Sequence, residues 1–321
     1  MYSRITGTGS FLPPKVMTNH DIEKLVDTSH DWIVERSGIH QRHIVEDETV
    51  SEMAEKACRL ALEMAGKTAD DVDLIVFATT TGDLVFPSSA SILQEKLGIT
   101  NESTAFDVQA VCAGFVFALG VADKFIKSGT HKCALVVGAE AMSRIIDWTD
   151  RGTCILFADG AGAVLIEADE EPGILSTHLH TDGRYKKLLY VNGGISDERD
   201  VYLKGQAYLQ MAGNDVFRFA VKTLGRIADE TLEANNMQKS DLDWLVPHQA
   251  NIRIIQATAK KLKMSMDKVV VTVHKHGNTS SASIPLALDE AIRDGRIQRG
   301  QTILLEGFGG GFTWGSALIK Y

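Results

Sequence analysis

Short apolar runs alternate with segments of helical periodicity along most of the chain. Asp73–Thr80 (DLIVFATT) and Cys133–Gly138 (CALVVG) are rich in apolar and β-branched residues, which predicts buried strands. Val50–Ala65 and Asp215–Asn235 place apolar residues three and four positions apart, which predicts amphipathic helices. This alternation predicts an α/β fold in which mixed, mostly parallel sheets are covered by helices.

One segment departs from the amphipathic pattern, because Ala113–Ala122 carries no polar side chain on any face. The residues before it, Ala105–Val111, predict a strand, and Gly129 after it suits the C-terminal cap of a helix. A helix that is apolar all round must be surrounded by protein. Cys112 then lies between a strand and the N-terminus of a central helix, where unpaired N–H groups and the helix dipole favour a thiolate.

The second half of the chain repeats the pattern of the first. Leu62-Glu63 followed by DDVDLIV (70–76) matches Leu232-Glu233 followed by SDLDWLV (240–246), 170 residues later. We therefore predict two pseudo-symmetric halves, residues 1–170 with the cysteine and residues 171–321 with further polar motifs. Packing about a pseudo-twofold axis would bring the central helices of the two halves together, which explains the apolar helix after Cys112.

Three motifs of the second half lie at strand ends or strand–helix junctions, where α/β folds display reactive groups. PHQAN (247–251) follows the predicted strand DWLV. HGN (276–278) lies between a predicted strand, 268–273, and a predicted helix, 280–294, and by the repeat it approaches the position of Cys112. GFGGGF (307–312) lets backbone N–H groups come close to a ligand.

Composition limits the classes of function. The chain has 321 residues and a formal net charge of −9, which disfavours general affinity for nucleic acid. No apolar run is long enough to span a membrane, and the N-terminus has no signal segment. The four cysteines are far apart and form no CxxC motif, which argues against a metal site or disulfides and fits a reducing cytoplasm: Cys58, Cys112, Cys133 and Cys154.

Taken together, these motifs resemble the β-ketoacyl-[acyl-carrier-protein] synthase III family. Further matches are GTGSFLPP, TSHDWIVERSGI, VCAGF, DRGT, MAGNDVF and FGGGFTWGSA. The resemblance implies a thiolase-like, five-layered αβαβα fold. It also implies a decarboxylative Claisen condensation of an acyl-CoA, expected to be acetyl-CoA, with malonyl-[acyl-carrier-protein]. The expected partners are acyl carrier protein and a second copy of the chain in a homodimer, and no cofactor is expected.

The resemblance also implies roles for residues at the strand ends. Cys112 resembles the nucleophile that takes the acyl group, and His248 and Asn278 resemble the pair that hydrogen-bonds the malonyl thioester carbonyl. The backbone N–H groups of Cys112 and Gly310 resemble an oxyanion hole. A thiolate suits this reaction because exchange between two thioesters is nearly isoenergetic.

A CoA site is implied at the N-terminal helix and along PHQAN. Trp32 and Arg36 are four residues apart and share a helical face. By resemblance, Trp32 and Arg151 sandwich the adenine, Thr28 and Arg36 lie near the phosphates, and Phe86 of a dimer partner closes the acyl pocket. The implied channel for the pantetheine arm comprises Gly213, Phe217, Ala250 and Asn251.

The basic helix NIRIIQATAKKLK is expected to bind acyl carrier protein. Arg253 and Lys260 lie seven residues apart, almost two helical turns, so they share a face beside the proposed channel. Such a basic face steers an acidic partner. The residues expected to contact the carrier protein are Gln249, Ala250, Asn251, Ile252, Arg253, Lys260 and Lys261.

Two alternatives stay open at this point. One is a related thiolase-fold condensing enzyme with a different acyl primer, because the large ring of Phe86 favours a short primer without deciding it. The other is a non-catalytic acyl-binding protein, which would not need Cys112, His248 and Asn278 together. Elongating synthases carry a second His at the position of Asn278, and thiolases carry a second Cys near the C-terminus, whereas the last cysteine here is Cys154.

Overall fold

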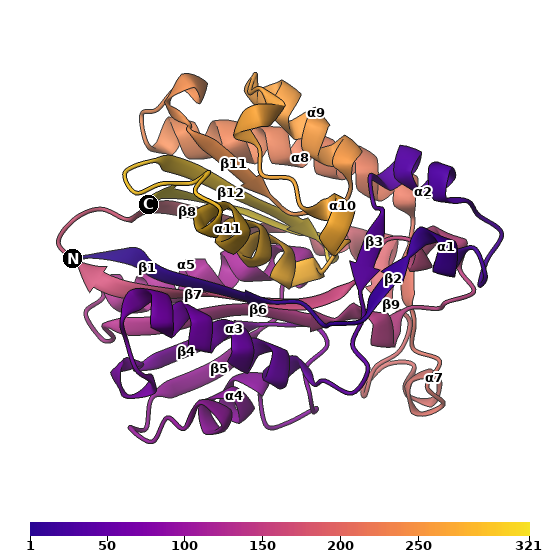
Figure 1. Cartoon of the computed structure of the whole chain (residues 1–321), viewed down its shortest axis with the longest axis horizontal. Helices are drawn as coiled ribbons and strands as arrows, with labels where there is room; N and C mark the ends of the chain where they lie inside the picture. The colour runs from indigo at the N-terminus through magenta and orange to yellow at the C-terminus, as the bar shows by residue number, and fades with distance from the viewer.

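The computed structural model describes residues 1–321 and contains two central sheets stacked face to face (Figure 1). The first has the strand order β1-β7-β6-β4-β5. In it β4 runs parallel to β5 and β6, whereas β7 runs antiparallel to both of its neighbours, β6 and β1. Its strands are β1 (Tyr2–Phe11), β4 (Leu74–Ala78), β5 (Thr104–Val108), β6 (Cys133–Ala141) and β7 (Asp159–Asp169).

The second sheet has the order β11-β12-β13-β8, with β11 and β12 parallel and the remaining pairs antiparallel. Its strands are β8 (Ile174–Thr181), β11 (Trp244–Pro247), β12 (Thr302–Gly309) and β13 (Thr313–Lys320). Along the chain, β7 is the last strand of the first sheet and β8 is the first strand of the second. The chain therefore crosses between the sheets just after residue 170, where the repeat predicts the division of the halves.

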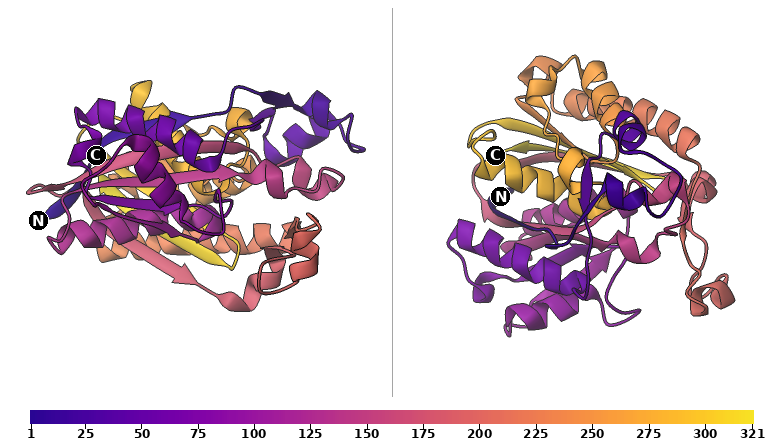
Figure 2. Two further views of the ribbon diagram at one scale, coloured as in Figure 1. Left: turned by 90° about the horizontal axis from the view of Figure 1, so that it is seen from below. Right: turned by 45° about the vertical axis from the view of Figure 1, so that its right-hand side comes forward.

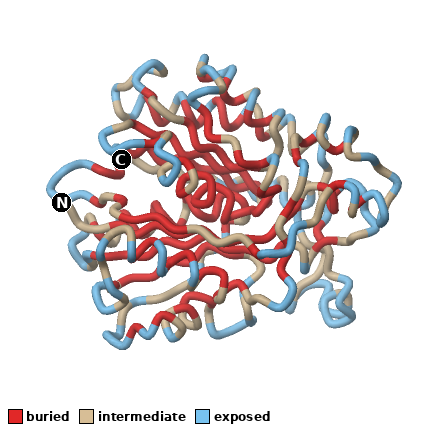
Figure 3. Tube along the Cα trace, viewed as in Figure 1, coloured by how far each residue is buried: buried red, intermediate tan, exposed pale blue.

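Helices complete five layers, as predicted (Figure 1). α3 (Val50–Ala65) and α4 (Ser89–Leu97) cover the outer face of the first sheet, and α8 (Gly213–Ala234) and α9 (Ile252–Leu262) cover that of the second. α5 (Gly114–Lys127) lies between the sheets with α11 (Ser283–Arg293), and their side chains form one core with both inner faces. The apolar character of α5 is therefore explained by its central position, in the region between the sheets that Figure 3 colours as buried.

The remaining elements are short. The helices are α1 (Asn19–Ile22), α2 (His30–Ser37), α6 (Arg151–Cys154), α7 (Arg199–Leu203) and α10 (Val273–His276). The strands are β2 (Val16–Thr18), β3 (Gln41–His43), β9 (Leu189–Val191) and β10 (Leu209–Met211). Seven 3₁₀ turns complete the chain: η1 (Ala69–Asp71), η2 (Val111–Ala113), η3 (Met142–Ile145), η4 (Gly183–Leu188), η5 (Lys239–Asp241), η6 (Met266–Lys268) and η7 (Ser280–Ala282).

The predicted symmetry is visible at the two central helices. η2 leads into α5, and η7 leads into α11 in the same way. Each turn begins at a residue with a left-handed backbone, Val111 with φ of 49° and Ser280 with φ of 50°. Such backbones are uncommon for residues other than glycine, so the shared geometry relates the Cys112 turn to the turn that follows Asn278.

Some predicted elements differ in the structure. Residues 268–273 form no strand, because only Val269 bridges to Leu245 before α10 begins. The predicted strand 105–111 ends at Val108, where the chain turns into η2. β12 extends into the glycine run, and the chain then reverses direction into the antiparallel strand β13. β13 was not predicted from the sequence, because it directly follows the glycine run.

Residues 183–206 form a largely exposed segment at the edge of the molecule. It contains η4, β9 and α7, and β9 pairs with β10, just after the segment, in a two-stranded ribbon. α7 projects from the body in both views of Figure 2. α7 is mostly exposed, while Leu189 and Leu209 of the ribbon are buried against the core that also contains Phe308. The ribbon thus connects a projecting segment to the cavity described next.

Candidate active site

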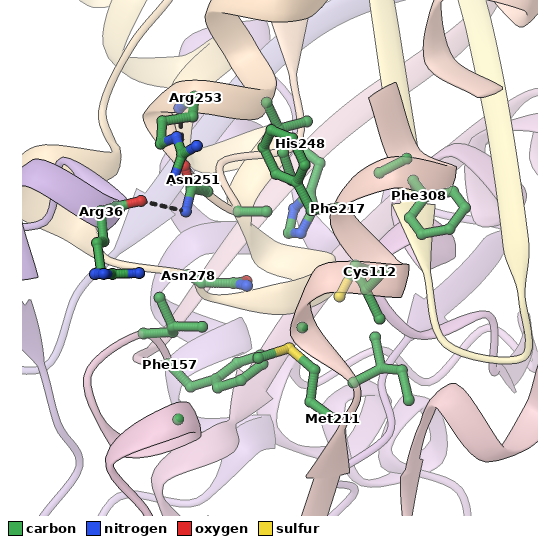
Figure 4. A pocket seen from close by; sticks show the side chains of 18 of the residues that line it. Arg36, Cys112, Phe157, Met211, Phe217, His248, Asn251, Arg253, Asn278 and Phe308 are labelled. Atoms are coloured by element: carbon green, nitrogen blue, oxygen red, sulfur yellow. Dashed lines mark hydrogen bonds between the residues drawn. The ribbon is translucent and has the colours of Figure 1, made fainter. Parts of the chain in front are cut away.

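A cavity of about 360 Å³ runs from the surface to the buried junction of the two halves. Cys112, His248 and Asn278 lie at its inner end and are almost completely buried, whereas Arg36 and Arg253 at the opposite end are exposed. In Figure 4 the sulfur of Cys112, the amide of Asn278 and the ring of His248 point into the same space. The structure therefore brings together the three residues predicted to act together.

Cys112 lies in η2, one turn before α5 begins. The N–H groups of Ala113 and Gly114 donate to Ala110 O and Val111 O within this turn, so neither is free to stabilise the sulfur. Burial raises the pKa of Cys112 to about 12, although a hydrogen bond with Ser280 acts in the opposite direction. The expectation of a resting thiolate is therefore wrong, since desolvation outweighs the helix N-terminus and the sulfur rests as a neutral thiol.

The glycine run packs directly against the nucleophile position. A Cβ atom on Gly309 would lie 2.6 Å from Cys112 N, which is closer than a Cβ contact allows. Glycine is thus required there, and it brings the Gly309–Gly310 peptide beside Cys112. This packing is compatible with the predicted oxyanion hole of the Cys112 and Gly310 N–H groups.

His248 follows β11 and is held by α11. Its Nδ1 lies 2.5 Å from Ser283 Oγ, and that hydroxyl accepts a hydrogen bond from Gln249 N at 3.2 Å. The Ser283 proton is therefore free to go to Nδ1, which leaves the ring proton on Nε2, facing the cavity. Burial lowers the pKa of His248 to about 3, so the imidazole is neutral and acts as a donor.

Asn278 is fixed by backbone bonds on both sides. Its N–H donates to Leu156 O, and its C=O accepts from Ala158 N, each at 2.9 Å. Its Oδ1 accepts from Ser280 N at 3.0 Å, so the Nδ2 amide is the group left for the cavity. His248 and Asn278 therefore present two neutral donors to one region beside the sulfur.

Part of the predicted CoA site surrounds the entrance. The guanidinium of Arg36 lies 4.6 Å from the Trp32 ring centroid, and that of Arg151 lies 4.8 Å from it. An adenine bound between Trp32 and Arg151 would have to separate the Arg151 guanidinium from the Trp32 ring. Thr28 is half-buried outside the cavity lining, whereas the predicted channel residues all line the cavity: Gly213, Phe217, Ala250 and Asn251.

The predicted carrier-protein helix is α9, and its basic side chains are exposed. Arg253 lies over the Phe217 ring at the entrance, and Lys260 and Lys261 are exposed further along the helix. Ile252 is half-buried and packs against Gly38. These positions leave the basic face free for a partner.

Gln249 does not belong to that face. Its side chain is fully buried, donates to Pro247 O and Val270 O, and accepts from the backbone N–H groups of Thr272 and Val273. The prediction that Gln249 contacts a carrier protein is therefore wrong. It lies inside the fold because residues 268–273 pass beside β11 as irregular backbone that needs these hydrogen bonds.

Phe86 lies outside the cavity of its own chain. It is 83% exposed and follows the exposed residues Leu84 and Val85. An aromatic residue this exposed, beside two other exposed apolar residues, is unusual for an isolated surface. The position agrees with a residue offered to another molecule.

Several cavity residues were not predicted from the sequence. Leu189 and Met211 come from the β9–β10 ribbon, and Phe308 comes from the end of β12. The sequence gives little indication that these residues line a cavity, because each is an isolated apolar residue in an irregular or glycine-rich stretch. Ser283, which contacts His248 from outside the cavity lining, could have been found more easily, since it belongs to the same HGNTSSAS stretch as Asn278.

Two other kinds of feature are absent from the structure. No cluster of three or more His, Cys, Asp or Glu side chains is arranged to hold a metal ion. No helix combines the length and the apolar character required to cross a bilayer.

Comparisons with known proteins agree with this geometry. Residues 106–183 match the family model of 3-oxoacyl-[acyl-carrier-protein (ACP)] synthase III, and residues 232–321 match the model of its C-terminal part. The chain is 63% identical to the β-ketoacyl-[acyl-carrier-protein] synthases III of Thioalkalivibrio sulfidiphilus and Thiobacillus denitrificans, covering 100% of this chain and 99% of each relative.

Solved structures are similar over the whole fold. The 3-oxoacyl-[acyl-carrier-protein] synthase III of Aquifex aeolicus has a TM-score of 0.94 and 43% identity, covering 99% of this chain and 100% of that one. The enzyme of Pseudomonas aeruginosa has a TM-score of 0.93 and 37% identity, covering 100% and 98%. The chain therefore belongs to the 3-oxoacyl-[acyl-carrier-protein] synthase III family, the condensing acyltransferases that initiate fatty acid synthesis.

Proposed function

We propose that the protein condenses acetyl-CoA with malonyl-[acyl-carrier-protein] through an acyl-Cys112 intermediate. The products are 3-oxoacyl-[acyl-carrier-protein], CoA and CO₂. The observation that carries this proposal is the convergence of one thiol and two neutral donors, from Cys112, His248 and Asn278, at the closed end of a single channel.

Acyl transfer comes first in the proposed sequence. The sulfur of Cys112 attacks the thioester carbonyl of acetyl-CoA, and the tetrahedral oxyanion forms beside the Cys112 and Gly310 N–H groups. Collapse of this intermediate breaks the bond to the CoA sulfur, and the proton that Cys112 loses is balanced by the proton that the CoA thiolate gains. The acyl group stays on Cys112, inside a cavity lined mostly by apolar side chains that exclude water.

Decarboxylation of the malonyl group follows. Loss of CO₂ leaves an enolate, and the Nε2–H of His248 and the Nδ2–H of Asn278 stabilise the charge on its oxygen. One preorganised donor of this kind contributes about 3 kcal/mol. The carbanion carbon then attacks the acyl carbonyl, a C–C bond forms, and the sulfur of Cys112 leaves. None of these steps requires a metal or redox cofactor.

One channel serves both substrates in this proposal, because CoA and the carrier protein share a phosphopantetheine arm. Trp32 and Arg36 would hold the nucleotide end of CoA at the entrance. The exposed Arg253, Lys260 and Lys261 of α9 would steer the acidic carrier protein to the same entrance.

We also infer a cytoplasmic homodimer. The edge of the first sheet is β5, whose backbone is unpaired on one side, and Phe106 and Phe125 beside it are only half-buried. Pairing of two β5 strands would cover this edge and bring Phe86 to the second copy.

A reducing cytoplasm suits the four free cysteines. Sedimentation analysis tests the assembly, and a monomer at micromolar concentration would contradict it.

Mass spectrometry tests the catalytic assignment. Incubation with acetyl-CoA alone should add one acetyl group on the Cys112 peptide, and malonyl-[acyl-carrier-protein] should then remove it with release of CO₂. Cys112→Ser should abolish both events, while Cys154→Ser serves as the matched control. Acetylation of another cysteine, or none, would overturn the proposal.

A further inference from the structure

The side-chain amide of Asn278 can stabilise an enolate only when its nitrogen, and not its oxygen, faces the cavity. The two ends of an amide have nearly the same size and exchange places by rotation about one bond. In the structure Oδ1 accepts a hydrogen bond from Ser280 N at 3.0 Å, which leaves Nδ2 for the cavity. The Ser280 N–H therefore decides whether Asn278 presents a donor or an acceptor to the substrate.

Ser280 has a backbone conformation that needs support from its surroundings. It begins η7 with φ of 50°, in the left-handed region. Residues with a side chain rarely adopt this conformation, and it persists where the neighbouring structure holds it. η7 has only three residues, and no side chain caps its N-terminus. The placement of the Ser280 N–H thus depends on contacts from outside η7.

Such a contact comes from Glu140, near the end of β6 in the other half of the chain. Its side chain is completely buried, and Oε1 accepts from Ser280 Oγ at 3.2 Å and from Ser281 Oγ at 2.9 Å. The Ser281 hydroxyl has a second acceptor, Ala78 O, at 3.0 Å. Both hydroxyls of η7 are therefore bonded to the first sheet, and Ser280 is bonded to it through Glu140.

The turn that follows β4 holds the other oxygen of Glu140. Thr81 Oγ1 lies 2.6 Å from Oε2, and Thr80 N donates to it at 3.0 Å. Thr81 Oγ1 also accepts from Ala141 N at 2.9 Å, so its own proton goes to Glu140. A carboxyl group keeps its acceptor capacity at Oε1 whether or not Oε2 carries a proton. The bond from Ser280 therefore does not require Glu140 to be ionised.

The pseudo-symmetric turn η2 lacks a contact of this kind. Val111 and Ser280 begin equivalent turns and are 169 positions apart, as are Glu140 and Gly309. Gly309 packs against η2 without a side chain, because a Cβ atom would lie 2.6 Å from the backbone nitrogen of the nucleophile. Glu140 instead reaches η7 with its carboxyl group. The turn of the nucleophile is thus left free of side-chain bonds from its strand, whereas η7 is bonded to its strand.

We propose that Glu140 is a positioning residue for Asn278 and acts through Ser280. This inference rests on the proposed role of Asn278 in decarboxylation. Glu140 touches no substrate, because its carboxyl holds Ser280 Oγ while Ser280 N holds the amide oxygen. Without the bond between Ser280 and Glu140, η7 can relax and the amide can turn. The amide oxygen would then face the enolate oxygen and repel the charge that Nδ2–H stabilises.

Two substitutions remove this bond in different ways. Ser280→Ala deletes the bridging hydroxyl but keeps the N–H that holds Asn278, and Glu140→Ala deletes the acceptor. Each variant is first acetylated on Cys112, freed of CoA and then mixed with malonyl-[acyl-carrier-protein], so that only the second half-reaction is timed. CO₂ release should be slower by about tenfold to a hundredfold, because a small misplacement of a catalytic group has an effect of this size. The concentration of malonyl-[acyl-carrier-protein] that gives the half-maximal rate should not change.

Thr80→Ala is the matched control for the hydrogen bonds of this carboxyl group. It removes a hydroxyl that contacts Glu140 from the turn after β4, and it keeps the Thr80 N–H. Because this hydroxyl holds no part of η7, the rate of CO₂ release should stay close to that of the unmodified protein.

A double-mutant comparison tests whether Glu140 acts through Asn278. Asn278→Ala by itself should slow CO₂ release by about 10²–10³-fold, the effect of losing one preorganised donor. Once the amide is gone, neither Ser280→Ala nor Glu140→Ala should slow the rate further. A general loss of structure would instead slow CO₂ release by the same factor with and without the amide.

The outcomes distinguish this inference from the proposed function. Equal slowing in the presence and in the absence of the Asn278 amide overturns the inference alone, and so does an unchanged rate in Ser280→Ala. If acetyl-Cys112 never forms, or if Asn278→Ala releases CO₂ at the unmodified rate, the proposed function fails and the inference fails with it. Should Glu140→Ala not fold, Ser280→Ala still decides the question.

Discussion

Replacing His248 by alanine separates the two half-reactions. The substitution removes one of two donors to the proposed enolate and leaves Cys112, Ser280 and the oxyanion N–H groups unchanged. Loss of one preorganised donor lowers a rate by about 10²–10³-fold, or about 3 kcal/mol. Decarboxylation of malonyl-[acyl-carrier-protein] should fall by this amount. Acetylation of Cys112 by acetyl-CoA should change by much less, because the ring of His248 offers the sulfur no acceptor.

The pH dependence sharpens this prediction. Burial lowers the pKa of His248 to about 3, below its ordinary value of 6.5, so the ring stays neutral from pH 5 to 8. Decarboxylation should therefore show no ionisation of a histidine in this range. The unfolded chain binds the proton more readily, so His248 makes folding stability fall as the pH decreases from 6.5 towards 3.

The assay is single-turnover release of ¹⁴CO₂ beside acetylation followed by mass spectrometry, in the unmodified protein and in His248→Ala. Circular dichroism controls for folding. Equal losses in both half-reactions would refute the donor role, because a pure donor to the enolate does not contribute to acyl transfer. A rate that titrates near pH 6.5 would refute the assignment of a neutral ring.

Three further predictions concern the surroundings of the site. Ser283→Ala removes the hydroxyl at His248 Nδ1, so the ring is free to change tautomer. CO₂ release should then slow by about tenfold while the rate of acetylation stays unchanged. Unchanged CO₂ release would contradict the assigned tautomer. Gly309→Ala places a Cβ 2.6 Å from the nucleophile's backbone nitrogen and should lower both the melting temperature and the acetylation rate, so a variant with both values unchanged would count against the tight packing. Charge reversal at Arg253 and Lys260 should raise KM for malonyl-[acyl-carrier-protein] by about tenfold and flatten its salt dependence, and an equal rise in KM for acetyl-CoA would argue against a carrier-protein role.

Much of the architecture could be predicted from local patterns. Strand and helix periodicity, repeated about 170 residues apart, indicates two α/β halves, and the uniformly apolar segment after Cys112 places its helix between them. Hydrophobic burial depends mainly on which residues are apolar, so these features follow from the order of residues alone. The motifs at the strand ends likewise indicated that Cys112, His248 and Asn278 meet.

Other properties depend on what surrounds each group in three dimensions. Gln249 follows His248 in sequence, yet it is buried because irregular backbone at residues 268–273 needs its amide. The neutral thiol of Cys112 also could not be predicted, since burial contributed by both halves opposes the helix N-terminus. Glu140 showed no motif at all. This buried side chain of β6 accepts hydrogen bonds from Ser280 and Ser281 only because η7 of the second half packs against β6 of the first, and the energy of a buried carboxyl group depends on such long-range neighbours rather than on sequence position.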